Sequence, residues 1–305
     1  MSVRPIPIGV STWIWYSPLN DARLSELAPR VRACGFDAIE LPVETLIDWD
    51  PVRAAVLLAD LGLGATTCAV MSGERDLTTA DSAVTSATQA YLRGCVDAAQ
   101  VVGSPVVAGP IYAPVGRLWR MDGPDRERTI DRLIESLRPV VEYAGDHGVT
   151  LALEPLNRFE TSLINTVDQA LEVVERVDSP ALGVCLDTFH MNIEEKDPAA
   201  AARLAGRRIA HVQACGTDRG TPGADQFGWF GFVDALAETG YRGPVCIESF
   251  TVDNDAIARA ASIWRRLAPS QDRLATDGLA FLRSILERVG TSTRTATGNR
   301  PIRPS

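Results

Sequence analysis

Two stretches of the chain decide the fold: TLALEPLNRFE at residues 150–160 and LGVCLDTFHMNIEE at residues 182–195. Each opens with a short apolar run that ends in an acidic residue, Glu154 in the first and Asp187 in the second. A short run that is almost entirely apolar predicts a strand buried on both faces, which is typical of parallel sheets. Each stretch therefore predicts a buried strand that carries a carboxylate at its carboxyl end.

The same pattern recurs along the chain and predicts eight strands. They are expected at Ile6–Val10, Ala38–Leu41, Gly64–Val70, Pro105–Ala108, Thr150–Glu154, Leu182–Leu186, Ile209–Gln213 and Pro244–Glu248. Amphipathic segments such as Asp21–Ala33 and Asp125–His147 lie between them, and Gly35, Gly148 and Gly240 are suited to end helices. No G-x-G-x-x-G motif follows the first strand, which disfavours an open dinucleotide-binding sheet. We predict a single-domain α/β protein, a (β/α)₈ TIM barrel over residues 1–290, followed by a disordered tail at residues 291–305.

Composition excludes several classes of function. The 305 residues are 46% hydrophobic and 23% charged, which is typical of a globular protein with a large core, and the net charge of −9 disfavours a nucleic-acid partner. The only lysine, Lys196, lies in the polar run EEKD, so Schiff-base chemistry is disfavoured. The six cysteines form no C-x-x-C pair, and neither a signal peptide nor a membrane-length apolar run is present. We expect a cytoplasmic enzyme with no membrane partner.

Four side chains near the ends of the last four predicted strands indicate a metal site. They are Glu154, Asp187, His211 and Glu248. Active sites of barrels form at the carboxyl ends of the strands, and three carboxylates placed together there would repel one another unless they shared a cation. Three carboxylates and one imidazole suit Mn²⁺, Co²⁺ or Mg²⁺, with Mn²⁺ favoured here, and the absence of thiolates disfavours a structural zinc site.

The chain has only three histidines, and each has a structural alternative to a functional role. His147 precedes Gly148 and is expected to cap a helix. His211 comes early in its strand, where it could be a core histidine bonded to a backbone carbonyl, but the three carboxylates favour the ligand interpretation. His190 lies three residues after Asp187, where a loop turns into the predicted site.

At these residues the chain resembles the ketose 3-epimerases (the D-tagatose and D-psicose 3-epimerases) within the xylose-isomerase-like barrel superfamily. The motifs that carry the resemblance are LEPLNRFE at 153–160, LDTFHMNIEE at 186–195, His211 with DRGTPG at 218–223, and IESF at 247–250. The resemblance implies that Glu154, Asp187, His211 and Glu248 hold the metal. It also implies that Glu154 and Glu248 act as paired acid and base, and that Glu160, His190 and Arg219 contact the sugar near its carbonyl.

The implied reaction explains these residue types. Epimerisation at C3 of a ketose removes a weakly acidic proton beside the carbonyl, and a metal chelated by O2 and O3 would stabilise the enediolate that forms. Two carboxylates on opposite faces would let one remove the proton and the other return it. Arg219 and His190 would donate to the oxygens that gain charge. Family members are often dimers or tetramers, so a homodimer or homotetramer is implied.

Some positions depart from the family pattern or have a second interpretation. Ser11 stands where typical members carry an aromatic residue, and the loop after Gly223 is longer and more acidic than usual. Trp15 is expected to contact the far end of the sugar, together with Trp13, although both could be core residues. Glu160 could instead pair only with Arg158. These departures bear on the identity of the sugar and not on the chemistry.

Other enzymes could use the same set of residues. A ketose/aldose or hydroxypyruvate-type isomerase would need the same metal and the same acid–base pair, as would a metal-dependent lyase that acts on an oxo-sugar. An endonuclease-IV-like repair protein is disfavoured by the few histidines and the negative charge, and a non-catalytic sugar-binding barrel would not need the carboxylates. Every metal-dependent interpretation requires Glu154, Asp187, His211 and Glu248 to meet at one cation.

Overall fold

Eight parallel strands pair side by side in sequence order, and β8 pairs back with β1, which closes the sheet into a barrel. The computed structural model describes residues 6–297, and only the backbone of residues 289–297. The strands are β1 (Ile8–Ser11), β2 (Ala38–Val43), β3 (Gly64–Ala69), β4 (Val106–Gly109), β5 (Thr150–Leu153), β6 (Leu182–Asp187), β7 (Ile209–Ala214) and β8 (Val245–Ile247). The predicted strands are all present, with ends that differ by one or two residues.

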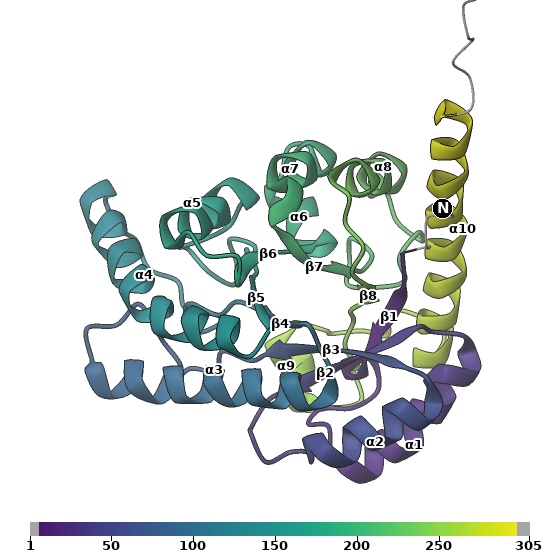
Figure 1. Ribbon diagram of the computed structural model, residues 1–305, viewed down its shortest axis with the longest axis horizontal. Coiled ribbons are helices and arrows are strands. Elements are labelled where there is room, and N and C mark those ends of the chain that lie inside the picture. Colours follow the sequence, from purple (N-terminus) through teal and green to yellow (C-terminus); the bar gives the residue numbers. More distant parts are fainter. Residues whose placement is uncertain (1–5, 298–305) are drawn as a thin grey trace, which may run out of the picture.

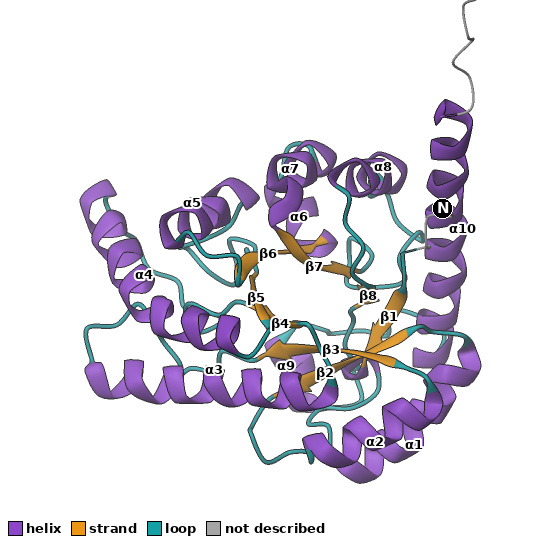
Figure 2. Ribbon diagram, viewed as in Figure 1, coloured by secondary structure: helices purple, strands orange, loops and turns teal. Residues whose placement is uncertain are grey.

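Helices surround this ring of strands, as Figure 1 and Figure 2 show. They are α1 (Asp21–Cys34), α2 (Pro51–Leu61), α3 (Ser82–Val102), α4 (Gly123–Asp146), α5 (Val167–Val177), α6 (Thr188–Glu194), α7 (Pro198–Ala205), α8 (Trp229–Thr239), α9 (Asp255–Ala260) and α10 (Gln271–Thr297), with short 3₁₀ turns η1 (Thr12–Ile14) and η2 (Gly206–Arg208). The prediction of a (β/α)₈ barrel is confirmed. Within residues 6–297, none of these helices combines the length and the apolar character that a membrane crossing requires.

Helix ends follow the chemistry expected from the sequence. Gly35 and Gly240 adopt positive φ at the ends of α1 and α8, which costs glycine little because it has no Cβ. His147 caps α4, as expected, and its Nδ1 lies 2.8 Å from the carbonyl oxygen of Tyr143. The boundary expected at residue 290 falls inside α10, whose backbone stays helical to Thr297. The part of the expected disordered tail at residues 298–305 lies outside the described residues.

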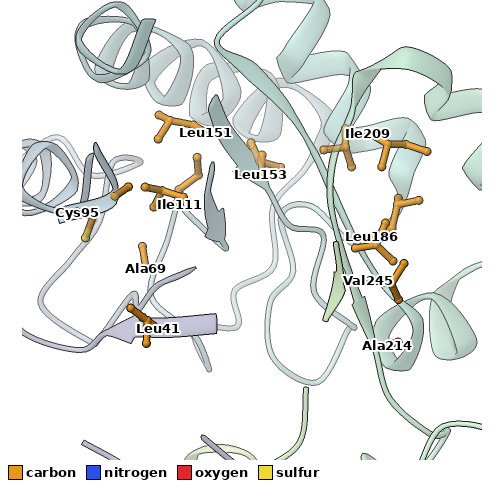
Figure 3. Packing of buried hydrophobic residues seen from close by; sticks show 14 of the residues in the cluster. Leu41, Ala69, Cys95, Ile111, Leu151, Leu153, Leu186, Ile209, Ala214 and Val245 are labelled. Carbon is orange, nitrogen blue, oxygen red and sulfur yellow. The ribbon is translucent and has the colours of Figure 1, made fainter. Parts of the chain in front are cut away.

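Alternation along the strands separates two layers of side chains. Leu151 and Leu153 of β5 belong to the large apolar cluster between barrel and helices, seen with Leu186 and Val245 in Figure 3. Ala152 belongs instead to a smaller cluster inside the barrel. Successive side chains of a strand point to opposite faces, so Glu154 points inward like Ala152. The fold thereby aims the acidic strand ends at the barrel axis.

Candidate active site

A cavity of about 580 Å³ opens at the carboxyl ends of the strands. Its acidic and basic lining comes from the second half of the chain and includes Glu154, Glu160, His190, Arg219 and Glu248, and Gln213 lies among them. A larger hollow of about 760 Å³ lies at the opposite ends of the strands and has no acidic residue among its lining. Only the first cavity combines carboxylates with an imidazole and a guanidinium, so we place the candidate site there, in agreement with the usual location in barrels.

Strand register brings the polar residues to the same end of the barrel. Asp187 at the end of β6 pairs with Gln213 of β7, and Gln213 pairs with Cys246 of β8, two residues before Glu248. The residues Glu154, Asp187, Gln213 and Glu248 are each no more than 5% exposed. Because β5, β6, β7 and β8 are neighbours, these four residues form an arc along one side of the barrel mouth.

The Arg219 guanidinium lies between two of the carboxylates. Its Nη1 donates to Asp187 Oδ2 at 2.6 Å and to Glu248 Oε2 at 2.7 Å. Arg219 itself has φ of +66° and is 5% exposed. Positive φ is costly for a residue with a Cβ, and such strain clusters at functional sites. Ser249 stabilises this backbone by donating to the Arg219 carbonyl oxygen at 2.6 Å.

His190 is held by the loop after β5. Its Nδ1 accepts from the backbone N–H of Asn157 at 3.0 Å, and the Asn157 side-chain amide lies 2.9 Å away. Nε2 lies 2.8 Å from Arg219 Nη2, 3.5 Å from Glu154 Oε1 and 3.6 Å from Asp187 Oδ2. His190 is therefore held with its Nε2 edge facing Arg219 and the carboxylates.

Glu160 also belongs to this group. Its Oε1 accepts from the Asn157 side chain at 2.8 Å, and it lines the cavity. Arg158 pairs instead with Glu194, at 2.9 Å. The alternative interpretation, in which Glu160 pairs only with Arg158, therefore does not apply.

Burial and mutual repulsion perturb the titration of the site. Burial, followed by the charges of Glu248 and Asp187, raises the pKa of Glu154, and burial together with the charges of Asp187 and Glu40 raises the pKa of Glu248. Burial would also raise the pKa of Asp187, but the charge of Arg219 and the backbone N–H of Phe189 hold it below its ordinary value. Burial, aided by Arg219, lowers the pKa of His190 to about 4, so its imidazole is neutral near pH 7.

The structure does not bring His211 to the other three expected ligands. His211 pairs with Cys185 across β6 and β7, two residues before the Asp187–Gln213 pair. Two residues of strand correspond to about 6.6 Å, so His211 lies one layer deeper in the barrel. There its Nε2 lies 2.6 Å from Glu40 Oε2. Gln213 occupies the level expected for His211, with its Nε2 donating to Glu248 Oε1 at 2.7 Å.

Trp15 also differs from expectation. Its indole N–H donates to Asp272 of α10 at 2.8 Å, and among the described residues Trp15 is not part of the cavity lining. Trp13 lines the cavity instead and packs against Phe250, with ring centroids 5.5 Å apart. The 3₁₀ turn η1 (Thr12–Ile14) explains the exchange, since it breaks the strand alternation that would have placed Trp13 and Trp15 on the same face.

The donor set fits a divalent cation. Asp187 and Glu248 share one guanidinium, and among the described residues the third buried carboxylate, Glu154, has a single basic neighbour within 4 Å, namely His190. Glu154, Asp187 and His190 each offer an atom within 4.8 Å of the others. An excess of buried oxygen ligands without thiolate suits Mg²⁺, Mn²⁺ or Co²⁺. The geometry is therefore that of a barrel enzyme equipped for metal-assisted acid–base chemistry.

Comparison with known proteins assigns the chain to a family. The family model of the xylose isomerase-like TIM barrel matches residues 28–285, and the chain belongs to this family. A probable ketose 3-epimerase of Synechocystis sp. is 38% identical over 93% of this chain and 98% of its own. The solved structure of an L-ribulose 3-epimerase superposes with a TM-score of 0.89 at 31% identity, covering 97% of this chain and all of its own. A D-allulose 3-epimerase from Methylomonas sp., solved with D-allulose, gives a TM-score of 0.84 at 28% identity, covering 92% of this chain and 98% of its own.

Proposed function

We propose that this protein is a ketose 3-epimerase that uses one divalent cation. The observation that carries the proposal is the position of Glu154 and Glu248 at the two ends of the arc formed by β5, β6, β7 and β8, with Asp187 and Gln213 between them. Two carboxylates that flank a cavity from separate strands suit a reaction in which a proton leaves one face of a carbon and returns to the other. The epimerases among its relatives support the choice of reaction.

The cation would be held by Glu154, Asp187, Gln213 and Glu248. Gln213 replaces His211 in this set because His211 lies a layer deeper, against Glu40. We propose Mn²⁺ as the ion, with Co²⁺ and Mg²⁺ as alternatives, since the ligands are carboxylate and amide oxygens. When bound, such an ion supplies Lewis-acid stabilisation of the negative charge that develops on the substrate oxygens.

The two glutamates would move the proton. One glutamate removes the proton from C3 on one face of the sugar, and the electron pair of the broken C–H bond is delocalised into the neighbouring carbonyl. The other glutamate, protonated at the start, delivers its proton to C3 on the opposite face. Burial raises the pKa of both carboxyls, which favours the protonated form that the donating glutamate needs. The two exchange roles in the reverse reaction.

The other polar groups would orient the sugar. His190 offers its imidazole, Arg219 offers a fixed guanidinium, and Glu160 can accept from a hydroxyl group. Asn157 fixes the positions of His190 and Glu160. Trp13 and Phe250 provide an apolar wall for the carbon skeleton, in the role that the sequence suggested for Trp15.

We also propose the class of substrate, the oligomeric state and the location in the cell. A free ketose, without phosphate, is the proposed substrate, in keeping with the L-ribulose and D-allulose named for the relatives. Phe159 at the cavity rim is 71% exposed and Trp264 is 72% exposed, and such exposed aromatics support a homodimer or homotetramer. The buried cysteines are all free, which supports a cytoplasmic location.

Proton exchange at C3 tests the proposal. Mn²⁺-loaded enzyme incubated with a panel of ketoses in deuterated water should convert one of them into its C3 epimer with deuterium at C3. Glu154→Gln and Glu248→Gln should each lose about 10²–10⁴-fold in rate. Deuterium at C1 with an aldose product would indicate a ketose/aldose isomerase, and loss of water would indicate a lyase. Either result would contradict C3 epimerisation.

A further inference from the structure

A buried pair of polar side chains lies beneath the proposed site, where barrel interiors usually hold apolar side chains. Glu40 of β2 and His211 of β7 are both fully buried, and Glu40 Oε2 lies 2.6 Å from His211 Nε2. The proposed reaction assigns no task to either residue. A buried pair of polar groups is weak grounds for stability, because apolar residues of similar volume often serve equally well. The pair therefore calls for a functional explanation.

The hydrogen bonds of Glu40 make it an acceptor only. Oε2 accepts from His211 Nε2 at 2.6 Å and from the Thr66 hydroxyl at 3.4 Å, and Oε1 accepts from Gln213 Nε2 at 3.2 Å. Among the described residues, no group bonds the other ring nitrogen of His211, Nδ1. A lone pair without a partner costs less than an N–H without one, which places the ring proton on Nε2, facing Glu40.

The third of these bonds links the pair to the site. Gln213 Nε2 donates both to Glu40 Oε1, in the layer below, and to Glu248 Oε1, in the site. Its oxygen, Oε1, has only the Cys185 thiol as a hydrogen-bond partner among the described residues, at 3.4 Å. If the amide were flipped, its oxygen would face the oxygens of both Glu40 and Glu248, and the two hydrogen bonds donated by Nε2 would be lost. A glutamine side chain has two different end atoms, and only the oxygen can bind a cation.

We propose that Glu40, held in place by His211, is a positioning residue that fixes the orientation of the Gln213 amide. Glu40 retains the NH₂ group, so the carbonyl oxygen is the atom left for the cation. The inference rests on the proposed metal site and adds to it the residues that set one of its ligands. It also accounts for the buried histidine: His211 satisfies the Glu40 oxygen that Gln213 does not reach.

A double-mutant cycle on Mn²⁺ affinity tests this inference. Glu40→Gln keeps size and shape but offers Gln213 an amide, which can pair with either end of the Gln213 side chain. Isothermal titration with Mn²⁺ should show affinity about 10–100-fold weaker than wild type, as is typical when a partner of a metal ligand is removed. In a Gln213→Glu background both end atoms of residue 213 are oxygens, so orientation no longer matters. In that background Glu40→Gln should weaken Mn²⁺ binding several-fold less than it does when residue 213 is glutamine.

The cycle separates positioning from other roles of Glu40. Glu40→Gln removes a negative charge near the cation in both backgrounds alike. If it weakens Mn²⁺ binding by the same factor in both, the inference is overturned; the same factor means agreement within about twofold, the usual scatter for additive pairs. Glu238→Gln makes the same chemical change on the surface of α8 and should leave the affinity at the wild-type value. If Glu40→Gln does not fold, the apolar replacement Glu40→Met with His211→Leu should fold and show the same 10–100-fold loss; wild-type affinity in that variant would refute the inference.

The result is distinguishable from a failure of the proposed function. A wild-type protein that binds no Mn²⁺, or whose Glu154→Gln and Glu248→Gln variants bind it unchanged, would refute the proposed metal site itself. A wild-type protein that binds Mn²⁺ through those residues, with equal costs of Glu40→Gln in both backgrounds, would refute only the role of Glu40.

Discussion

Removal of Arg219 should strengthen metal binding while abolishing turnover. In the structure its Nη1 donates to Asp187 at 2.6 Å and to Glu248 at 2.7 Å, so it holds two of the carboxylates proposed as ligands. A cation can use these oxygens fully only if the guanidinium gives up at least one of the two bonds. Arg219→Leu removes that competition and also removes a group proposed to orient the sugar.

The size of the effect follows from the two hydrogen bonds. A hydrogen bond to a charged group contributes about 1.5–3 kcal/mol, and each 1.4 kcal/mol corresponds to a factor of ten in affinity. Loss of one such bond on metal binding in the wild type predicts affinity at least about tenfold tighter in Arg219→Leu. The comparison should be made near pH 8, because burial raises the pKa of Glu154 and Glu248 and protonation would oppose the metal.

Isothermal titration with Mn²⁺ measures the change, and the C3 exchange assay measures turnover. Arg158→Leu is the matched control, since that arginine pairs with Glu194 and its side chain is 62% exposed; its affinity should equal that of the wild type. Mn²⁺ binding to Arg219→Leu that is equal to or weaker than wild type would refute the reasoning. It would mean that Arg219 supports the ligands and does not compete with the cation.

Three further predictions follow from the same site. Because burial raises the pKa of Glu154, its protonated form stabilises the metal-free fold at low pH, and this contribution is lost as pH rises through the folded-state pKa. Glu154→Gln should therefore gain stability relative to wild type as pH rises above the ordinary pKa of a glutamate. Urea-unfolding midpoints of the two proteins that stay parallel as pH rises would contradict this. Trp13→Ala should raise the KM for the sugar, whereas Trp15→Ala should leave it unchanged, and the reverse ranking would restore Trp15 to the site. Dialysis against a chelator should abolish C3 exchange and added Mn²⁺ should restore it; exchange that survives complete metal removal would rule out the cation.

Most of the fold could be predicted from the sequence because parallel barrel strands are short, apolar and regularly spaced. The carboxylates at Glu154, Asp187 and Glu248 were equally visible, since a charged residue that ends an apolar run stands out. Arg219 could be placed from its motif, but its position between Asp187 and Glu248 could not, because that depends on a backbone of positive φ in a loop.

His211 and Trp15 show what the sequence does not reveal. The place of each depends on the direction in which its side chain points, and one irregularity in or next to a strand reverses that direction. Pairing between β6 and β7 shifts at Val184 and Cys185, and the 3₁₀ turn η1 interrupts the alternation after β1. One signal was available: the predicted strand Ile209–Gln213 ends at Gln213, and active groups lie at strand ends. Glu40 carried no such signal, because its partners are far away in sequence.

The cavity lining also divides along the chain. Trp13, the segment around Met71 and the turn at Pro110 supply a largely apolar wall from the first four strands, whereas every acidic or basic group in the lining comes from the segments after β4. Preference for one ketose over another can therefore change in the amino-terminal half while the proton-transfer machinery in the other half stays intact. A chimera that joins the first four strand–helix units of a relative to β5–β8 of this chain should inherit the relative's choice of sugar, provided that Glu40 is retained.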